Sequence, residues 1–200
     1  PTPIMNDPSD QSLCNGEQTD PVVFTGTDVT TFHWTNDNIS IGLPASGTGN
    51  IAAFTAVNTG NTTQTATITV TPRHTANGFS CEGLSLTFTI TVYPTPDVTA
   101  IPASQNICSG GTTNIVLTSN VAGTTFNWTA LLQSGSNTTF NANGSGSPIS
   151  EVITNNSNLP AIVRYVITAT ANGCTGDQIV VDVTVYPSII VSSNPASPVT

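Results

Sequence analysis

The sequence predicts an all-β protein made of tandem sandwich domains, and three observations carry that prediction: its composition, an internal repeat and regularly spaced strands. Charged residues make up only 6% of the 200 residues, against about 25% in a typical soluble domain. Val, Ile and Thr recur in dense runs, which favours β-sheet. Disorder is a poor explanation, because disordered chains are usually rich in charge and poor in β-branched residues.

An internal repeat organises the chain. Its matched positions lie 93 to 95 residues apart, with Cys14 recurring as Cys108. The other matches are Phe32, Trp34 and Thr35 with Phe126, Trp128 and Thr129, Asn77-Gly78 and Cys81 with Asn172-Gly173 and Cys174, and Thr91-Val92-Tyr93-Pro94 with Thr184-Val185-Tyr186-Pro187. We therefore predict a domain over 1–94, a second over 95–187, and the first strand of a further repeat over 188–200. Since the pattern stops partway through a unit, we expect the natural array to continue.

The strand pattern is clearest in the second repeat. Strands are expected over 98–107, 113–119, 125–131, weakly within 136–147, and over 149–153, 162–171 and 178–186. About seven strands in about 93 residues, with turn signals at regular spacing, are typical of an immunoglobulin-like β-sandwich. Trp34 and Trp128 fall on the third strand, where a tryptophan fills the core, and both are predicted to be core residues. No segment has a convincing helical period.

Charge excludes several classes of partner. The net charge is −9, with Arg73 and Arg164 as the only bases and no lysine. This argues against nucleic acid, whose phosphates require clustered Lys and Arg, and against anionic membrane surfaces. No run of 18 apolar residues predicts a membrane span, and the start of the chain does not resemble a signal peptide.

The titratable residues do not suggest an enzyme. His33 and Asp37 lie near one another in sequence, but no nucleophile motif accompanies them. Asp177 and Asp182 lack matched partners in the first repeat and are interpreted as solvated charges rather than a glycosidase pair. We expect no catalytic residues.

Calcium is the one cofactor that the acidic residues suggest, and they support it only weakly. Asp7, Asp10, Glu17 and Asp20 cluster in the first repeat, and Asp97 lies at the domain junction. Carboxylate oxygens suit calcium, but no EF-hand loop is present. Asp7, Asp10 and Asp97 are therefore weak calcium candidates, and no cofactor is expected.

The four cysteines predict disulfides formed in an oxidising compartment, because no Cys-x-x-Cys metal pair is present. One pairing joins Cys14 to Cys81 and Cys108 to Cys174 within each repeat. The other joins Cys14 to Cys174 across the repeats and leaves Cys81 and Cys108 for the preceding and following repeats of the array, beyond residues 1–200. The second avoids bonding opposite poles of one sandwich, since a disulfide needs Cα atoms within about 7 Å. Both pairings stay open on the sequence alone.

Three motifs make each repeat resemble the PKD-like and immunoglobulin-like repeats of secreted Bacteroidota surface proteins. They are Cys-x-Gly before the second strand, aromatic-x-Trp-Thr on the third, and Asn-Gly near a cysteine before a closing Val-Tyr-Pro. The first repeat departs in two places: Phe79-Ser80 intervene before Cys81, and its long strand lacks a counterpart of Tyr165. The resemblance implies an extracellular place at the bacterial cell surface, export by a type 9 system, and gliding-type giant adhesins among the relatives.

The sequence thus predicts a non-enzymatic stalk or spacer of a secreted adhesin or extracellular filament. Its expected partners are neighbouring repeats and other copies in a filament, with any surface or glycan ligand unspecified. The alternative is a polysaccharide- or polymer-binding module accessory to a secreted enzyme. That alternative requires an exposed strip of aromatic residues, whereas most aromatics here fall in core phase.

Overall fold

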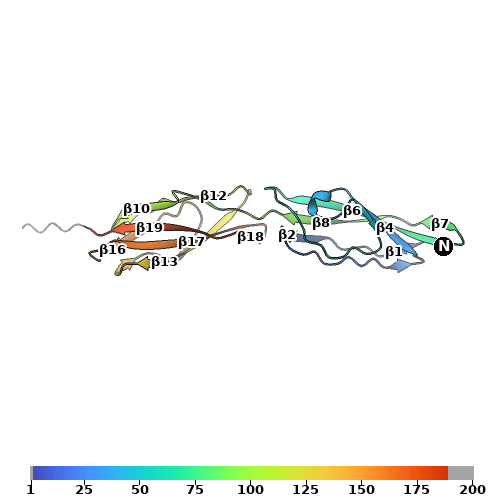
Figure 1. The fold of residues 1–200 in the computed structure, drawn as a ribbon, viewed down its shortest axis with the longest axis horizontal. Helices are drawn as coiled ribbons and strands as arrows, with labels where there is room; N and C mark the ends of the chain where they lie inside the picture. The colour runs from blue at the N-terminus through green and yellow to red at the C-terminus, as the bar shows by residue number, and fades with distance from the viewer. Residues whose placement is uncertain (1, 189–200) are drawn as a thin grey trace, which may run out of the picture. The chain divides into compact units, whose positions relative to one another are not determined.

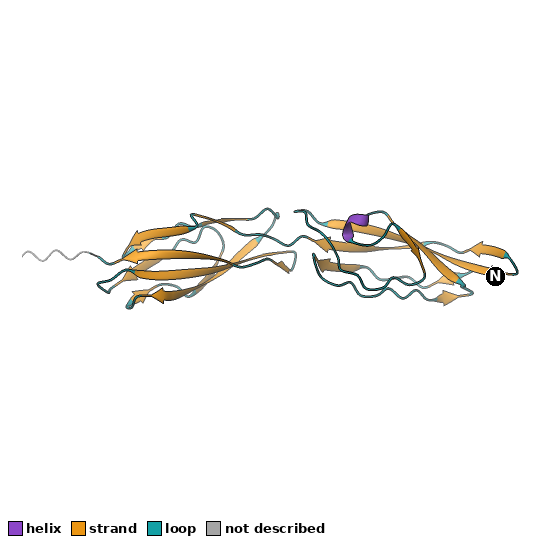
Figure 2. Ribbon diagram, in the orientation of Figure 1, coloured by secondary structure: helices purple, strands orange, loops and turns teal. Residues whose placement is uncertain are grey.

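The computed structural model describes residues 2–188 and contains two compact units, each a β-sandwich (Figures 1 and 2). The first unit comprises the residues up to Pro96 with Asn120–Thr124 and Thr170–Thr175, and the second comprises Asp97–Ser119, Thr125–Ala169 and the residues from Gly176. The predicted class, tandem all-β sandwiches, is confirmed. The predicted boundary after residue 94 stays a prediction, and the proposed strand over 188–200 lies outside the described residues except for Ser188.

A six-stranded sheet forms one layer of the first unit. Its order is β2-β8-β6-β4-β5, with β7 pairing β6 beyond this path. The strands are β2 (Gln11–Cys14), β4 (Thr31–Asn36), β5 (Ser46–Thr48), β6 (Gln64–Ala76), β7 (Phe79–Glu82) and β8 (Leu86–Tyr93). Only β2 and β8 are parallel to each other. The short strands β1 (Ile4–Met5) and β3 (Gly26–Thr27) pair separately, and a single 3₁₀ turn, η1, covers Ile39–Ile41.

The second unit repeats this plan. Its six-stranded sheet has the order β10-β19-β17-β13-β15, with β18 pairing β17. The strands are β10 (Ser104–Cys108), β13 (Thr125–Ser134), β15 (Asn143–Ser145), β17 (Ala161–Ala171), β18 (Cys174–Thr175) and β19 (Ile179–Tyr186). The facing layer contains β9 (Thr99–Ile101), β11 (Gly111–Thr112), β12 (Val116–Thr118), β14 (Thr138–Thr139) and β16 (Val152–Asn155).

The expected first strand over 98–107 is wrong as a single element. The structure divides it into β9, which pairs antiparallel with β12, and β10, which pairs parallel with β19. Pro102 lies between the two strands and has no backbone N–H to continue a ladder. The chain therefore changes layers at this proline.

Strict alternation builds each core. Along β17 every second residue is buried, and Val163, Tyr165 and Ile167 are fully enclosed. In the first unit Ala66, Ile68 and Val70 on β6 are fully buried. Side chains of a strand alternate between faces, so this pattern fixes the strand register and directs one face into the core. Trp34 and Trp128 are 7% and 6% exposed and belong to the two cores.

Candidate functional site

A disulfide joins Cys14, the last residue of β2, to Cys174, the first residue of β18, with a Cα–Cα distance of 5.6 Å. Cys174 follows a tight turn in which Asn172 and Gly173 both have positive φ, the conformation for which Asn-Gly is favoured. Both cysteines belong to the first compact unit. Of the two pairings left open by the sequence, the structure has the one that joins the two sequence repeats.

The register of β6 explains why Cys14 does not bond to Cys81. Cys14 lies opposite Tyr93, whose neighbour Val92 pairs with Gln64 at the start of β6. Cys81 pairs with His74 near the other end of β6. A strand rises about 3.3 Å per residue, so this stretch of β6 separates the two cysteines by roughly 33 Å. A disulfide spans about 7 Å at most between Cα atoms.

A set of backbone and amide hydrogen bonds holds Cys14 in place; we call Cys14, Asn15, Asn58 and Tyr93 the first rim. The Asn15 N–H donates to Tyr93 O at 2.9 Å. Asn58 is 4% exposed, and its Nδ2 donates to Val92 O at 2.8 Å and to Thr62 O at 2.9 Å. The Asn58 N–H donates to Asn15 Oδ1 at 2.8 Å. The end of β8 is thereby tied to the loop that precedes β6.

The second unit reproduces this arrangement at Cys108, Ser109, Asn155 and Tyr186, the second rim. The Ser109 N–H donates to Tyr186 O at 2.7 Å. Asn155 is 2% exposed, and its Nδ2 donates to Val185 O at 2.8 Å and to Leu159 O at 2.9 Å. The Asn155 N–H donates to Ser109 Oγ at 2.9 Å. The two rims therefore share one design, with Ser109 in the place of Asn15.

The rims differ in the state of their cysteines. Cys108 is a free, exposed thiol, whereas Cys14 is bonded and half-buried. Tyr186 is 45% exposed, whereas its counterpart Tyr93 is half-buried. Cys108 and Tyr186 line a hollow of about 610 Å³ together with Pro160, Pro187 and Ser188. Among residues 2–188, the second rim is thus an open, largely apolar surface with a thiol at its edge.

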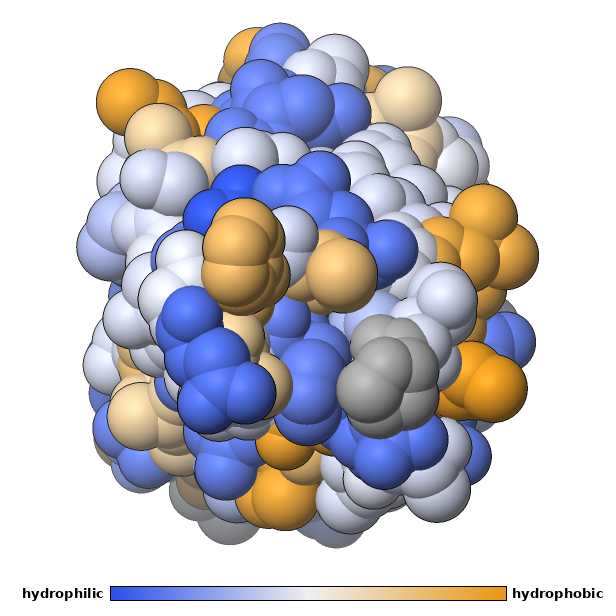
Figure 3. Space-filling model, turned by 90° about the vertical axis from the view of Figure 1, so that its right-hand side faces the viewer, coloured by the Kyte–Doolittle hydropathy of each residue, from blue (hydrophilic) through white to orange (hydrophobic). Residues whose placement is uncertain are grey.

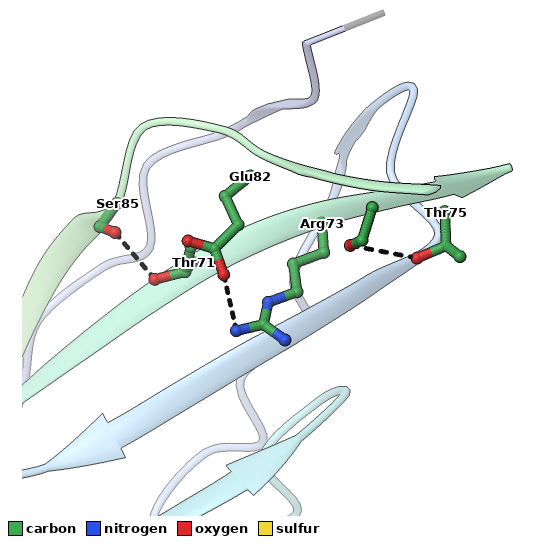
Figure 4. A network of polar contacts seen from close by, with 6 residues as sticks. Thr71, Arg73, Thr75, Glu82 and Ser85 are labelled. Carbon is green, nitrogen blue, oxygen red and sulfur yellow. Dashed lines mark hydrogen bonds and ion pairs between the residues drawn. The ribbon is translucent and has the colours of Figure 1, made fainter. Parts of the chain in front are cut away.

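The β6–β7 hairpin carries the other free thiol, Cys81, which is also exposed. An ion pair between Arg73 Nη2 and Glu82 Oε1 at 2.6 Å fastens the base of this hairpin, next to a Thr71–Ser85 hydroxyl contact of 2.8 Å (Figure 4). Phe79, beside the turn, is 79% exposed. Figure 3 faces the end of the first unit that carries β7, where apolar side chains lie in separate groups among polar ones.

A tryptophan–glycine contact recurs in both cores, and sequence reasoning missed its glycine. Gly47 on β5 lies opposite Trp34, and Gly144 on β15 lies opposite Trp128. A Cβ added at either glycine would stand 2.2 Å from the Cζ2 atom of the indole. The sequence contained a signal for this contact: Gly47 and Gly144 are 97 residues apart, and so are the rim asparagines Asn58 and Asn155.

The centre of the second core holds a polar group that the first core lacks. Tyr165 packs edge-on against Trp128, with ring centroids 5.3 Å apart, and its hydroxyl donates to Glu151 Oε2 at 3.2 Å. Glu151 is 8% exposed and also accepts a hydrogen bond from Asn141 Nδ2. Burial raises the pKa of Tyr165, and the nearby charge of Glu151 raises it further. Ile68 and Phe54 occupy the matching positions in the first repeat.

His33, Asp37, Asp177 and Asp182, which the sequence offered as catalytic candidates, lie in strand pairs, ion pairs or solvent in the structure. Asp37 Oδ1 accepts the Thr67 N–H at 2.7 Å, and His33 lies half-buried on β4. Asp182 forms a two-pronged ion pair with Arg164, which lowers the pKa of Asp182 mainly through the hydrogen bond. Asp177 is exposed.

The weak calcium candidates do not assemble into one ligand set. Asp7 and Asp10 line a surface hollow of about 320 Å³ that Asp20 shares, but Asp10 Oδ1 already accepts the Thr89 N–H at 2.6 Å. Asp97 lies in the second unit and accepts a hydrogen bond from Ser119. Within residues 2–188, no three His, Cys, Asp or Glu side chains are placed to hold a metal ion together. The only helical segment in that range is η1, and it could not cross a membrane.

Comparison with known proteins gives a family for both sequence repeats. The PKD-like domain family matches residues 11–96 and again 105–189. No curated protein matches the chain.

Among solved structures, the tandem immunoglobulin domains IG1 and IG2 of DIP-gamma are 12% identical with a TM-score of 0.48, over 93% of this chain and 98% of that one. Mouse cadherin-23 EC22-24 is 11% identical with a TM-score of 0.49, over 94% of this chain and 67% of that one. The human desmocollin-1 ectodomain is 12% identical with a TM-score of 0.48, over 94% of this chain and 42% of that one. Because these likenesses are remote, the assignment depends on the matched ranges and on the two sandwiches: the chain belongs to the PKD-like domain family, which it contains twice.

Proposed function

We propose that this chain is a non-catalytic, extracellular spacer segment of a surface adhesion protein or filament, and that its task is to transmit force across serial domains. The observation that carries the proposal is the Cys14–Cys174 bond, which joins residues of two repeats and closes 160 residues of chain. A disulfide suits an oxidising, extracellular compartment. The sparse charge and the absence of lysine suit a polar coat with little nonspecific attraction.

The mechanism is a covalent bypass. When the chain is pulled from its two ends, tension that reaches Cys14 passes through the disulfide to Cys174. The backbone of the intervening residues is then not part of the covalent path between the two ends, although these residues contain most of both sandwiches. Force therefore cannot extend the chain between the cysteines, although β2 and β19 lie outside the closed loop and still bear load through their pairing with β8, β10 and β17.

Single-molecule force extension tests this mechanism. With handles at residues 1 and 200, the oxidised chain should not release the residues between Cys14 and Cys174. Reduction should release them and lengthen the fully stretched chain by roughly 550 Å, at 3.3–3.6 Å per residue. If the oxidised and reduced chains extend equally, force does not use the disulfide and the proposed function fails.

The finer form of the proposal follows the sequence resemblance: a giant adhesin of Bacteroidota, exported by a type 9 system and serving attachment or gliding. The alternative, a polysaccharide-binding module, is disfavoured by the aromatic residues, since Phe24, Phe88 and Phe126 are buried with both tryptophans. A glycan array on the intact chain separates the two functions. Saturable binding to one polysaccharide class would support the alternative.

A further inference from the structure

We propose that the second rim is a docking site for a β6–β7 hairpin of a second copy of this chain, and that Cys108 forms a disulfide there with Cys81 of that copy. This inference rests on the proposed function, because it supplies the link by which PKD-like units would continue in series. Its three supports are a completed example of the bond, an open surface and a matching free hairpin.

The completed example is the first rim. Cys14 ends a strand paired in parallel with β8 and lies opposite Tyr93, and it is bonded to a cysteine that follows an Asn-Gly turn. Cys108 ends a strand paired in parallel with β19 and lies opposite Tyr186. The buried amides of Asn58 and Asn155 fix both rims through the same pair of carbonyl contacts. The second rim is therefore built like the first rim, which holds the hairpin cysteine Cys174, but the thiol of its own cysteine, Cys108, is free.

The open surface also has room and the right character. The hollow beside Cys108 measures about 610 Å³, and Pro160, Tyr186 and Pro187 are among the residues that line it. Within the described residues, no charged side chain borders it. An exposed apolar hollow of this kind favours an apolar side chain, because burying apolar surface is favourable.

The β6–β7 hairpin offers such a side chain next to a thiol. Its turn residues Asn77 and Gly78 have φ values of 52° and 81°, matching 50° and 82° at Asn172 and Gly173. Cys81 is three residues after Gly78, whereas Cys174 is one residue after Gly173. Strand side chains alternate with a period of two, so this difference of two residues places both cysteines on the same face of their hairpins. Phe79 is 79% exposed and lies between the turn and Cys81, so its ring can enter the hollow when the sulfurs meet.

The covalent step balances with an external disulfide as oxidant. The thiols of Cys108 and Cys81 lose two protons and two electrons and form one S–S bond. Glutathione disulfide accepts them and is reduced to two glutathione thiols. The interface pairs different surfaces of the two copies, so repeated docking would add copies head to tail.

Two variants of the whole chain test the site. C81S keeps only Cys108 as a free thiol, and C108S keeps only Cys81. Mixed in equal amounts in a glutathione redox buffer, they should give a C81S–C108S disulfide dimer in about tenfold excess over either homodimer. Non-reducing electrophoresis and mass spectrometry measure the ratio. Unselective thiol chemistry would give only about twice as much mixed dimer as each homodimer, and that ratio would overturn the proposal.

The apolar hollow has its own control. Y186S in the C81S chain should reduce the mixed dimer toward the unselective ratio, whereas V180S should not, although Val180 is an exposed residue of the same strand at 55%. Equal yields from both would overturn the role of the hollow. Neither result depends on force extension of the single chain. Failure of the dimer test therefore leaves the covalent bypass intact, and failure of the force-extension test leaves the docking site intact.

Discussion

The two units share a framework and differ at two places, and the differences are informative. Both contain an indole packed on a glycine, a buried rim asparagine and a cysteine at the end of a parallel-paired strand. At the rims, Cys14 is bonded while Cys108 is free. At the core centres, the first unit has Ile68 where the second has Tyr165 bound to Glu151. The framework thus tolerates exchange of core chemistry but keeps the cysteine, the buried asparagine and the tyrosine of each rim.

The largest expected effect comes from the tryptophans. W128A should destabilise the second unit by about 3–5 kcal/mol, since it removes a buried aromatic and leaves a cavity. W34A should do the same to the first unit. Hydrogen–deuterium exchange read by mass spectrometry can follow each unit separately. If W128A raises hydrogen–deuterium exchange equally in both units, the two units unfold as one cooperative body and cannot be compared as separate ones.

The rim cysteines should differ strongly when each is replaced. C14S should cost about 2–4 kcal/mol, because it opens a cross-link that constrains a long loop of the unfolded chain. C108S should cost less than about 0.5 kcal/mol, because it alters an exposed side chain. Urea denaturation of both variants measures the contrast. Equal losses would mean that Cys108 is not free in the folded protein.

The rim asparagines should behave alike in the two units. N58A and N155A each leave one buried strand carbonyl, Val92 O or Val185 O, without its amide donor, which should cost about 1–3 kcal/mol. N156A is the matched control, because Asn156 is exposed. Urea midpoints give the losses. A large effect at one rim and none at the other would contradict their shared design.

Alkaline pH should weaken only the second unit. Burial and Glu151 raise the pKa of Tyr165 in the folded protein above its unfolded value of about 10, so folding favours the neutral phenol. The stabilisation is complete below about pH 10 and is lost as pH rises toward the folded pKa. Between pH 9 and 11 the second unit should lose about 1 kcal/mol of unfolding free energy.

Y165F should abolish this pH dependence, and unfolding followed by exchange in each unit at both pH values would show it. The same loss in the first unit, where Ile68 replaces the tyrosine, would rule out Tyr165 as the cause.

Much of the fold could be predicted from the sequence because the repeat and the strand alternation are local signals. The period of Val163, Tyr165 and Ile167 fixed the core face, and the position of Trp128 fixed the layer that it fills. The division of the first strand at Pro102 was missed, because a single proline can end a strand or merely lie on its edge. The choice between two cysteine pairings required the register of β6, which depends on long-range pairing that no local pattern encodes.

The contacts within the cores were beyond the sequence for a similar reason. Gly47 and Gly144 resemble ordinary turn residues until the opposing strand brings an indole against them. Asn58 and Asn155 resemble loop residues until their amides are seen to reach strand carbonyls. Each depends on what lies across the sheet.

One measurement tests the central claim, that the disulfide links two serial repeats, most directly. Trypsin can cut this chain only after Arg73 and Arg164, giving peptides 1–73, 74–164 and 165–200. After alkylation of free thiols without reduction, the account predicts for the isolated monomer that 1–73 is bonded to 165–200, and that 74–164 carries two alkylated cysteines. Any bond from 74–164 to an outer peptide would contradict it, and bonds to both outer peptides are what pairing within each repeat would give.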